Sequence, residues 1–151
     1  MKRLTQLIDH LENYISKSAV VNSKISVSSV GWHIDHTLIV FNQIVGALKR
    51  SDPANYRWKF NFWRTVIYSI NKIPRGKVKA PPSVLPKTTV TTEHIKSQLN
   101  EARLNLVELE LFDRNSYFRH PFFGDLNLKP TIKFLKLHTN HHLKIIDEIL
   151  H

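Results

Sequence analysis

The sequence predicts an all-α fold in which four long amphipathic helices form a four-helix bundle. Apolar residues recur at steps of three and four in several separate stretches, and no stretch alternates apolar and polar residues with period two. The 151 residues are 42% hydrophobic and 23% charged, which suits a single globular domain over residues 1–151. We therefore expect helices alone to build the core.

The first predicted helix covers about Lys2–Ser18, and leucines and isoleucines form its apolar face: Leu4, Leu7, Ile8, Leu11 and Ile15. Residues 20–28 are rich in Val and Ser and are interpreted as a connector. Ser29 can then cap a second helix that ends near Arg50, because a serine hydroxyl accepts a hydrogen bond from a backbone N–H of the first turn.

A long crossover between the second and fourth helices carries a short third helix and a proline-rich strap. The third helix covers roughly Tyr56–Lys72, and its aromatic residues have helical spacing: Trp58, Phe60, Phe62 and Trp63. We expect them to pack in the core, with a base-stacking platform as the alternative. Four prolines between Pro74 and Thr89 predict an extended strap over the surface.

The fourth predicted helix begins at Thr91 or Thr92 and ends near Phe112. Its apolar residues follow the spacing of a bundle seam: Ile95, Leu99, Ala102, Leu106 and Leu109. The last helix runs to about Leu150 and has Pro130 in its first turn, where the missing N–H costs nothing.

Charge and cysteine content limit the classes of function. The chain has no cysteine, so any metal must be held by histidines and carboxylates. The formal net charge is +10, and we interpret the scattered Lys and Arg residues as favouring solubility and small anionic ligands, with nucleic acid as the lesser alternative. No apolar run is long enough for a membrane span or a signal core, so we expect a cytoplasmic protein with no membrane partner.

His138 and His142 stand one turn apart on the last predicted helix, near the edge of its apolar stripe. Three interpretations are open. In the first, each imidazole is half-buried and forms a hydrogen bond to a neighbouring helix. In the second, the pair forms a surface cluster with His141 that titrates near neutral pH. In the third, the pair binds a metal ion. A third ligand would come from the second helix, which offers His33 and His36, and the helical wheel slightly favours His33.

The segment Ser29-Val-Gly-Trp-His-Ile-Asp-His-Thr-Leu38 resembles the second-helix signature of the DinB/YfiT-like superfamily, and His138-x-x-x-His142 resembles its closing pair. The loop His120–Gly124 and the segment Ile73–Gly76 are similar to features of an uncharacterised DinB-like branch. In order and spacing, the resemblance covers most of the chain. It implies an up-down-down-up bundle with the long crossover, and often a dimer.

The resemblance also implies the metal ligands His36, His138 and His142 on one divalent transition metal ion with open water positions, while His33 and His141 are extra imidazoles. Zinc or nickel is the expected metal, with iron or manganese as alternatives. Family members of known activity include thiol-dependent S-transferases and isomerases.

Three neutral histidines would leave the ion its full charge, so that a bound water or thiol becomes more acidic. We therefore expect an S-transferase or hydrolase that acts on a small molecule, with an anionic thiol as one candidate. Alternatives are a non-catalytic helical binding or structural module and, less favoured, a basic nucleic-acid-binding protein.

Side chains around the site have expected roles as well. Candidates for fixing the imidazole tautomers are Asp35, Asn140 and Asp147. Three cations of the strap are interpreted as solubilising charge or as groups that hold an anionic ligand: Arg75, Lys77 and Lys79. A His-Glu-x-x-His protease is not expected, because Thr139 follows His138.

Overall fold

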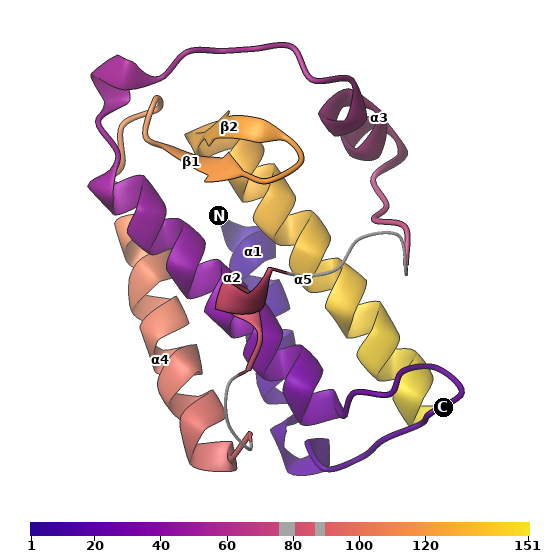
Figure 1. The fold of residues 1–151 in the computed structure, drawn as a ribbon. Coiled ribbons are helices and arrows are strands. Elements are labelled where there is room, and N and C mark those ends of the chain that lie inside the picture. The colour runs from indigo at the N-terminus through magenta and orange to yellow at the C-terminus, as the bar shows by residue number, and fades with distance from the viewer. Residues whose placement is uncertain (76–80, 87–89) are drawn as a thin grey trace.

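The computed structural model describes residues 1–75, 81–86 and 90–151, and within these ranges the chain is mainly helical (Figure 1). The helices are α1 (Lys2–Glu12), α2 (Val30–Arg50), α3 (Phe62–Ile70), α4 (Thr92–Glu108) and α5 (Leu128–Leu150). Two short strands, β1 (Tyr117–His120) and β2 (Gly124–Asn127), precede α5. No helix in these ranges combines the length and the apolar character that crossing a bilayer requires.

The four longer helices surround one apolar core. Helix α2 packs against α4 and α5, and α1 packs against the same two helices from the other side (Figure 1). All four contribute fully buried side chains, among them Leu4, Ile8, Ile34, Leu38, Phe41, Ile95, Leu99 and Leu135. The mainly helical class predicted from the apolar period is confirmed.

Local capping sets the start of two helices as the sequence predicts. The Ser29 side chain accepts a hydrogen bond from the Trp32 amide at 3.1 Å, and the Thr91 side chain accepts one from the His94 amide at 3.2 Å. Helix α4 ends at Glu108, before the predicted Phe112. Helix α5 begins at Leu128, so that Pro130 lies in its first turn.

The first helix is shorter than the predicted Lys2–Ser18, because α1 ends at Glu12 and a 3-10 turn, Ile15–Lys17, follows. The chain then meets the start of α2, where the Gly31 amide donates to the Ser18 carbonyl at 2.8 Å. A Cβ atom on Gly31 would lie 3.0 Å from both Cβ and the carbonyl oxygen of Ser18. Glycine therefore permits this close approach.

The prediction that the aromatic residues around α3 pack in the core is wrong. Helix α3 covers only part of the predicted Tyr56–Lys72, and four aromatic side chains are between 61% and 67% exposed: Trp58, Phe60, Phe62 and Trp63. Arg64 is the buried residue of the helix, and its guanidinium donates to the backbone carbonyls of Lys59 at 2.6 Å and Phe123 at 3.4 Å. Only two of the four aromatic residues, Phe62 and Trp63, lie in α3. Trp58 and Phe60 precede it in a segment where apolar and polar residues alternate, so the helical spacing predicted for the four is wrong as well.

Helices do not build the core alone. Strands β1 and β2 pair antiparallel, with Phe118 opposite Leu126, and both side chains are buried with Phe123 in the main core. Each strand has only four residues, and β1 begins with two adjacent aromatic residues, Tyr117 and Phe118, so neither strand stands out by a period-two pattern in the sequence.

The loop between the strands is organised around His120. Its Nδ1 accepts hydrogen bonds from the amides of Phe122 and Phe123 at 3.1 and 3.2 Å, and its ring stacks on Phe123 with centroids 4.3 Å apart. Gly124 closes the turn with a φ of +70°, a backbone conformation that residues other than glycine rarely adopt. Burial lowers the pKa of His120 to about 4.

Part of the strap is described as well. A 3-10 turn, Pro82–Val84, packs against α2, while Lys77 and Lys79 lie outside the described residues. Arg75 forms a two-bonded ion pair with Glu148 of α5, with distances of 2.5 and 2.8 Å. This pair attaches the start of the strap to the C-terminal end of α5.

Candidate metal centre

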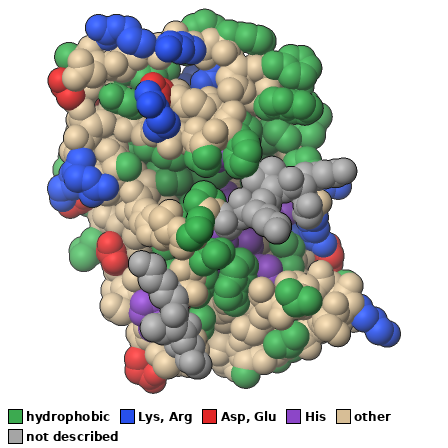
Figure 2. Space-filling model, in the orientation of Figure 1, with side chains coloured by type: hydrophobic (Ala, Val, Ile, Leu, Met, Phe, Trp, Pro, Cys, Tyr) green, Lys and Arg blue, Asp and Glu red, His purple; other side chains and the backbone are tan. Residues whose placement is uncertain are grey.

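Three histidines from two helices converge between α2 and α5. His36 lies on α2 and His138 and His142 lie on α5, and one ring nitrogen from each falls within 4.8 Å of the others. The three pairs of ring centroids are 4.6 to 5.3 Å apart. Figure 2 shows histidine side chains reaching the surface near the middle of this face of the molecule.

The spacing of the ring nitrogens suits one ion. Nitrogens bound at 2.0–2.1 Å in a tetrahedral site lie about 3.4 Å from one another. The three ring nitrogens lie within 4.8 Å of one another, so the side chains would have to draw closer together to bind one ion. With that adjustment, these residues could hold a metal ion.

The backbone of the strap fixes the orientation of His36. Nδ1 of His36 lies 2.8 Å from the carbonyl oxygen of Val84, which can only accept, so Nδ1 carries the proton. The unprotonated Nε2 atom is then left to bind a ligand. On its other side, the ring of Trp32 stacks on His36 with centroids 5.0 Å apart and an interplanar angle of 11°.

A chain of hydrogen bonds leads away from His142. Its Nδ1 lies 3.0 Å from Nδ1 of His33, and Nε2 of His33 lies 3.0 Å from the Ser26 hydroxyl. Two proton arrangements satisfy this chain. Only the one with the proton on Nδ1 of His142 leaves Nε2 of His142 free to bind a metal, and His33 then donates to Ser26.

Burial keeps the three imidazoles neutral. It lowers the pKa of His36, and it holds the pKa values of His138 and His142 well below the usual range, with repulsion from neighbouring histidines as a further cause. The neutral imidazole is the form that binds metals.

The two extra histidines also stay neutral near pH 7. The pKa of His33 and the pKa of His141 both fall to about 4, first because of burial and then because of nearby positive charge. A cluster that titrates near neutral pH, one of the three sequence-based interpretations, is therefore wrong for His141. His141 packs edge-on against His142, with ring centroids 5.2 Å apart.

The expected tautomer-fixing side chains point elsewhere. Asp35 faces α4, where its Oδ1 lies 3.2 Å from Nε2 of His94 outside hydrogen-bond geometry, and burial raises the pKa of Asp35. Asp147 accepts a hydrogen bond from the Tyr14 hydroxyl. Among the hydrogen bonds within the described residues, none joins Asn140 to the three histidines.

The groups that form hydrogen bonds to the converging histidines were missed in the sequence. The Val84 carbonyl is a backbone atom and leaves no signal in a residue pattern. His33 was considered as a ligand, but the structure places it behind His142 as a hydrogen-bond partner. Ser26 precedes His33 by seven residues in the connector, where no pattern marks it.

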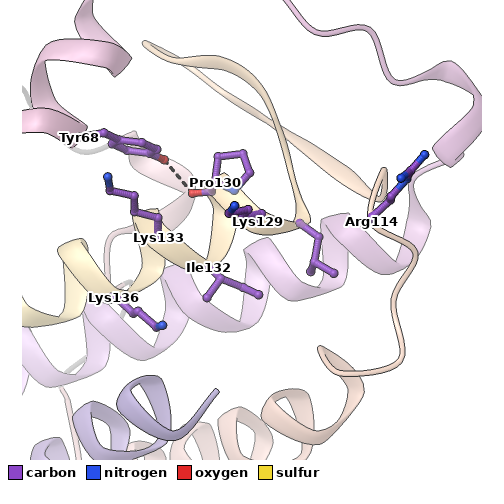
Figure 3. Close-up of a pocket in the computed structure, with 8 residues that line it drawn as sticks. Tyr68, Arg114, Lys129, Pro130, Ile132, Lys133 and Lys136 are labelled. Atoms are coloured by element: carbon purple, nitrogen blue, oxygen red, sulfur yellow. Dashed lines mark hydrogen bonds between the residues drawn. The ribbon is translucent and has the colours of Figure 1, made fainter.

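Two open cavities lie away from the histidines. A cavity of about 610 Å³ is lined by Tyr68, Pro130 and the lysines at the start of α5 (Figure 3), and one of about 250 Å³ lies beside it. None of the three converging histidines lines either cavity.

Comparisons with protein-family models, curated proteins and solved structures gave no match to this chain. The resemblance to the DinB/YfiT-like superfamily thus stays a prediction from short motifs. The convergence of the three histidines is the observation on which a functional conclusion can rest.

Proposed function

We propose that this is a divalent-metal-binding protein of the DinB-like type, in which His36, His138 and His142 hold one transition metal ion. The single observation that carries the proposal is the convergence of three neutral imidazoles from two helices, with ring nitrogens within 4.8 Å of one another. In the same proposal, α1, α2, α4 and α5 form an up-down-down-up four-helix bundle, with α3 and the strap on the long crossover.

The protein residues would preorganise this site. The Val84 carbonyl holds His36 with Nε2 unprotonated, and His33 can do the same for His142. Partners of this kind set the tautomer and direction of a ligating imidazole before the ion arrives. Neither side chain has to give up a proton near pH 7, since burial keeps both imidazoles neutral.

The donor set also bears on the metal. Three imidazole nitrogens without a thiolate or a carboxylate favour zinc and nickel, with iron and manganese behind them, and disfavour magnesium and calcium. An ion held by three neutral histidines acts as a Lewis acid toward a water or a thiol in its remaining positions.

We propose that the site acts on a small molecule, as a thiol-dependent S-transferase or a hydrolase. An anionic ligand is supported by the formal net charge of +10, and Arg75 would have to leave its ion pair with Glu148 to bind such a ligand directly. The net positive charge would attract a carboxylate-bearing thiol. If the coordination sphere were closed, the protein would instead be a non-catalytic binding module.

The metal content of single-residue variants tests the proposal. Wild-type protein equilibrated with Zn²⁺ and freed of excess metal should retain about one ion per chain by elemental analysis. His36→Ala, His138→Ala and His142→Ala should each retain almost none. His141→Ala is the matched control, because His141 lies next to His142 on the same helix and outside the cluster.

The proposal fails if the wild-type protein retains no zinc, nickel, cobalt or manganese, or if the His141 variant loses metal as fully as the others do. A second measurement addresses the open positions. The visible spectrum of the Co²⁺-loaded protein should change when a small anionic thiol is added. An unchanged spectrum would favour the non-catalytic module.

A further inference from the structure

Acidic residues are absent from nearly all of the crossover between α2 and α4, where the sequence has one acidic residue, Asp52 at its start. Residues 53–92 contain no Asp or Glu and eight cations: Arg57, Lys59, Arg64, Lys72, Arg75, Lys77, Lys79 and Lys87. The formal net charge of the chain is +10, so most of the excess positive charge lies in this one connection. Lys and Arg residues occur along the whole sequence, but their excess over Asp and Glu is concentrated in residues 53–92.

The same connection carries an exposed apolar surface, here called the aromatic face: Trp58, Phe60, Phe62, Trp63 and Ile70, each between 57% and 67% exposed. Ile70 follows Trp63 by seven residues, so both lie on one side of α3. Figure 2 shows hydrophobic side chains gathered at the upper right, where Figure 1 places α3. Contiguous apolar patches of this kind mark interaction sites.

Specific contacts hold the aromatic face outward. The Asn61 side chain caps α3 and also donates to the Phe122 carbonyl at 2.9 Å. The Tyr68 hydroxyl donates to the Pro130 carbonyl at 2.8 Å. Together with the buried guanidinium of Arg64, these bonds fix the inner side of α3, so the exposed side is set by the fold.

Cations lie within the segment of the aromatic face and on the neighbouring part of α5. Arg57 and Lys59 alternate with Trp58 and Phe60 along the segment before α3, and both are exposed. The ammonium group of Lys133 lies 5.1 Å from the centroid of the Tyr68 ring. The cavity beside Tyr68, on the inner side of α3, is lined by three more cations, as Figure 3 shows: Arg114, Lys129 and Lys136. Within the described residues, none of these side chains forms an ion pair.

We propose that the aromatic face docks on the surface of a membrane that contains anionic lipids. Trp and Phe side chains enter the boundary between headgroups and acyl chains, while neighbouring Lys and Arg side chains bind anionic headgroups. This departs from the sequence-based expectation of no membrane partner. That expectation rested on the lack of a membrane span, and surface docking does not require one.

Other occupants fit the surface less well. A second copy of this chain would bring two acid-free basic segments together, which like-charge repulsion opposes. Single-stranded nucleic acid would need flat, separate rings for base stacking. Here Phe62 and Trp63 pack edge-on against each other, with centroids 5.6 Å apart and an interplanar angle of 71°, and Ile70 offers no ring.

Vesicle co-sedimentation tests the proposal. Wild-type protein should bind vesicles of phosphatidylcholine with about one-third phosphatidylglycerol, bind pure phosphatidylcholine far less, and dissociate as salt rises. Phe60→Ser/Trp63→Ser should weaken binding at least about tenfold, because two inserting side chains are lost. The matched control is Leu104→Ser/Val107→Ser, which removes two equally exposed apolar side chains from α4.

A second pair of variants tests the role of charge. Arg57→Glu/Lys59→Glu should weaken binding by at least about 25-fold, since each cation near an anionic surface is worth about fivefold. Lys17→Glu/Lys24→Glu makes the same charge change at two exposed lysines outside the crossover and should have a smaller effect. All substituted side chains are exposed, so circular dichroism and thermal unfolding should match the wild type.

Three results would overturn the proposal. The first is equal binding to phosphatidylcholine alone. The second is an equal loss of vesicle binding in the two serine double variants. The third is no vesicle binding at all, with Phe60→Ser/Trp63→Ser instead abolishing either a dimer or the retention of a single-stranded oligonucleotide. Metal content does not enter these measurements, so they stand apart from the proposed function.

Discussion

Replacing His33 by phenylalanine tests the inferred link between His33 and His142, the proposed metal ligand. His33 is buried, and its Nδ1 lies 3.0 Å from Nδ1 of His142. Phenylalanine keeps a ring of similar size but has no nitrogen, so His142 would lose the acceptor for its Nδ1 proton. The ligand then keeps its place in the core but loses the group that fixes its tautomer.

The expected loss of metal affinity is about 10- to 100-fold, the usual effect of removing a hydrogen-bond partner of a ligating histidine. This corresponds to about 1.4 to 2.7 kcal/mol. The effect should be smaller than that of His142→Ala, which removes a ligand. Ser26→Ala should act more weakly in the same direction, because Ser26 reaches His142 only through His33.

Competition with a chromophoric chelator measures the affinity for Zn²⁺, and the spectrum of the Co²⁺ form reports the ligands. His33→Phe should bind more weakly while the Co²⁺ spectrum keeps its three-histidine character. His141→Phe is the matched control, since His141 packs against His142 without a hydrogen bond between the rings, and its affinity should stay within about twofold of the wild type.

Two results would refute this reasoning. Unchanged affinity in His33→Phe would mean that the 3.0 Å contact between the two Nδ1 atoms does not orient His142. A loss of affinity as large as that of His142→Ala, or a Co²⁺ spectrum without its three-histidine character in the protein that still binds, would mean that His33 is itself a ligand, as the helical wheel favoured.

Three further predictions concern the fold. Burial lowers the pKa of His120 to about 4, below the value near 6.5 of the unfolded chain, so the unfolded state takes up the proton first as the pH falls. The wild type should therefore lose about 3 kcal/mol of stability from this residue between pH 6.5 and 4. His120→Asn, which keeps an acceptor for the two turn amides, should lack that part of the loss in urea titrations at several pH values. Phe41→Ala should lower the free energy of unfolding by about 3 to 5 kcal/mol, because the Phe41 side chain of α2 is fully buried in the main core; a loss under about 1 kcal/mol would contradict this packing. Gly31→Ala should lower the melting temperature, with a cost of about 1 to 3 kcal/mol from the clash with Ser18, and an unchanged melting temperature would show that the two segments can separate freely.

Local patterns were enough to place three of the long helices. Helices α2, α4 and α5 begin within one or two residues of where the capping residues and the first-turn proline predict. The four-residue spacing of His138 and His142 likewise fixes their common face, because a helix stacks such residues whatever surrounds it. These features depend on interactions within a few residues, and one sequence contains all of that information.

Local patterns could not decide whether His33 or His36 of α2 joins His138 and His142 in the candidate metal centre. A helical wheel gives a direction relative to the apolar side of one helix, and on that measure His33 is nearer the core. Both side chains are buried, but His36 is held by a carbonyl 48 residues away and meets the face of α5 that carries His138 and His142. The motif resemblance pointed to His36 where the period did not.

The face that α3 turns outward was also decided by the tertiary structure. Its apolar spacing is equally compatible with a buried or an exposed side. Contacts of Arg64 with carbonyls of Lys59 and Phe123 turn the charged residue inward and leave the aromatic residues outside. The sequence by itself thus determined where helices form and which residues share a face. Which faces meet depended on the packing of distant segments, because hydrogen bonds and buried contacts between them have no period along the chain.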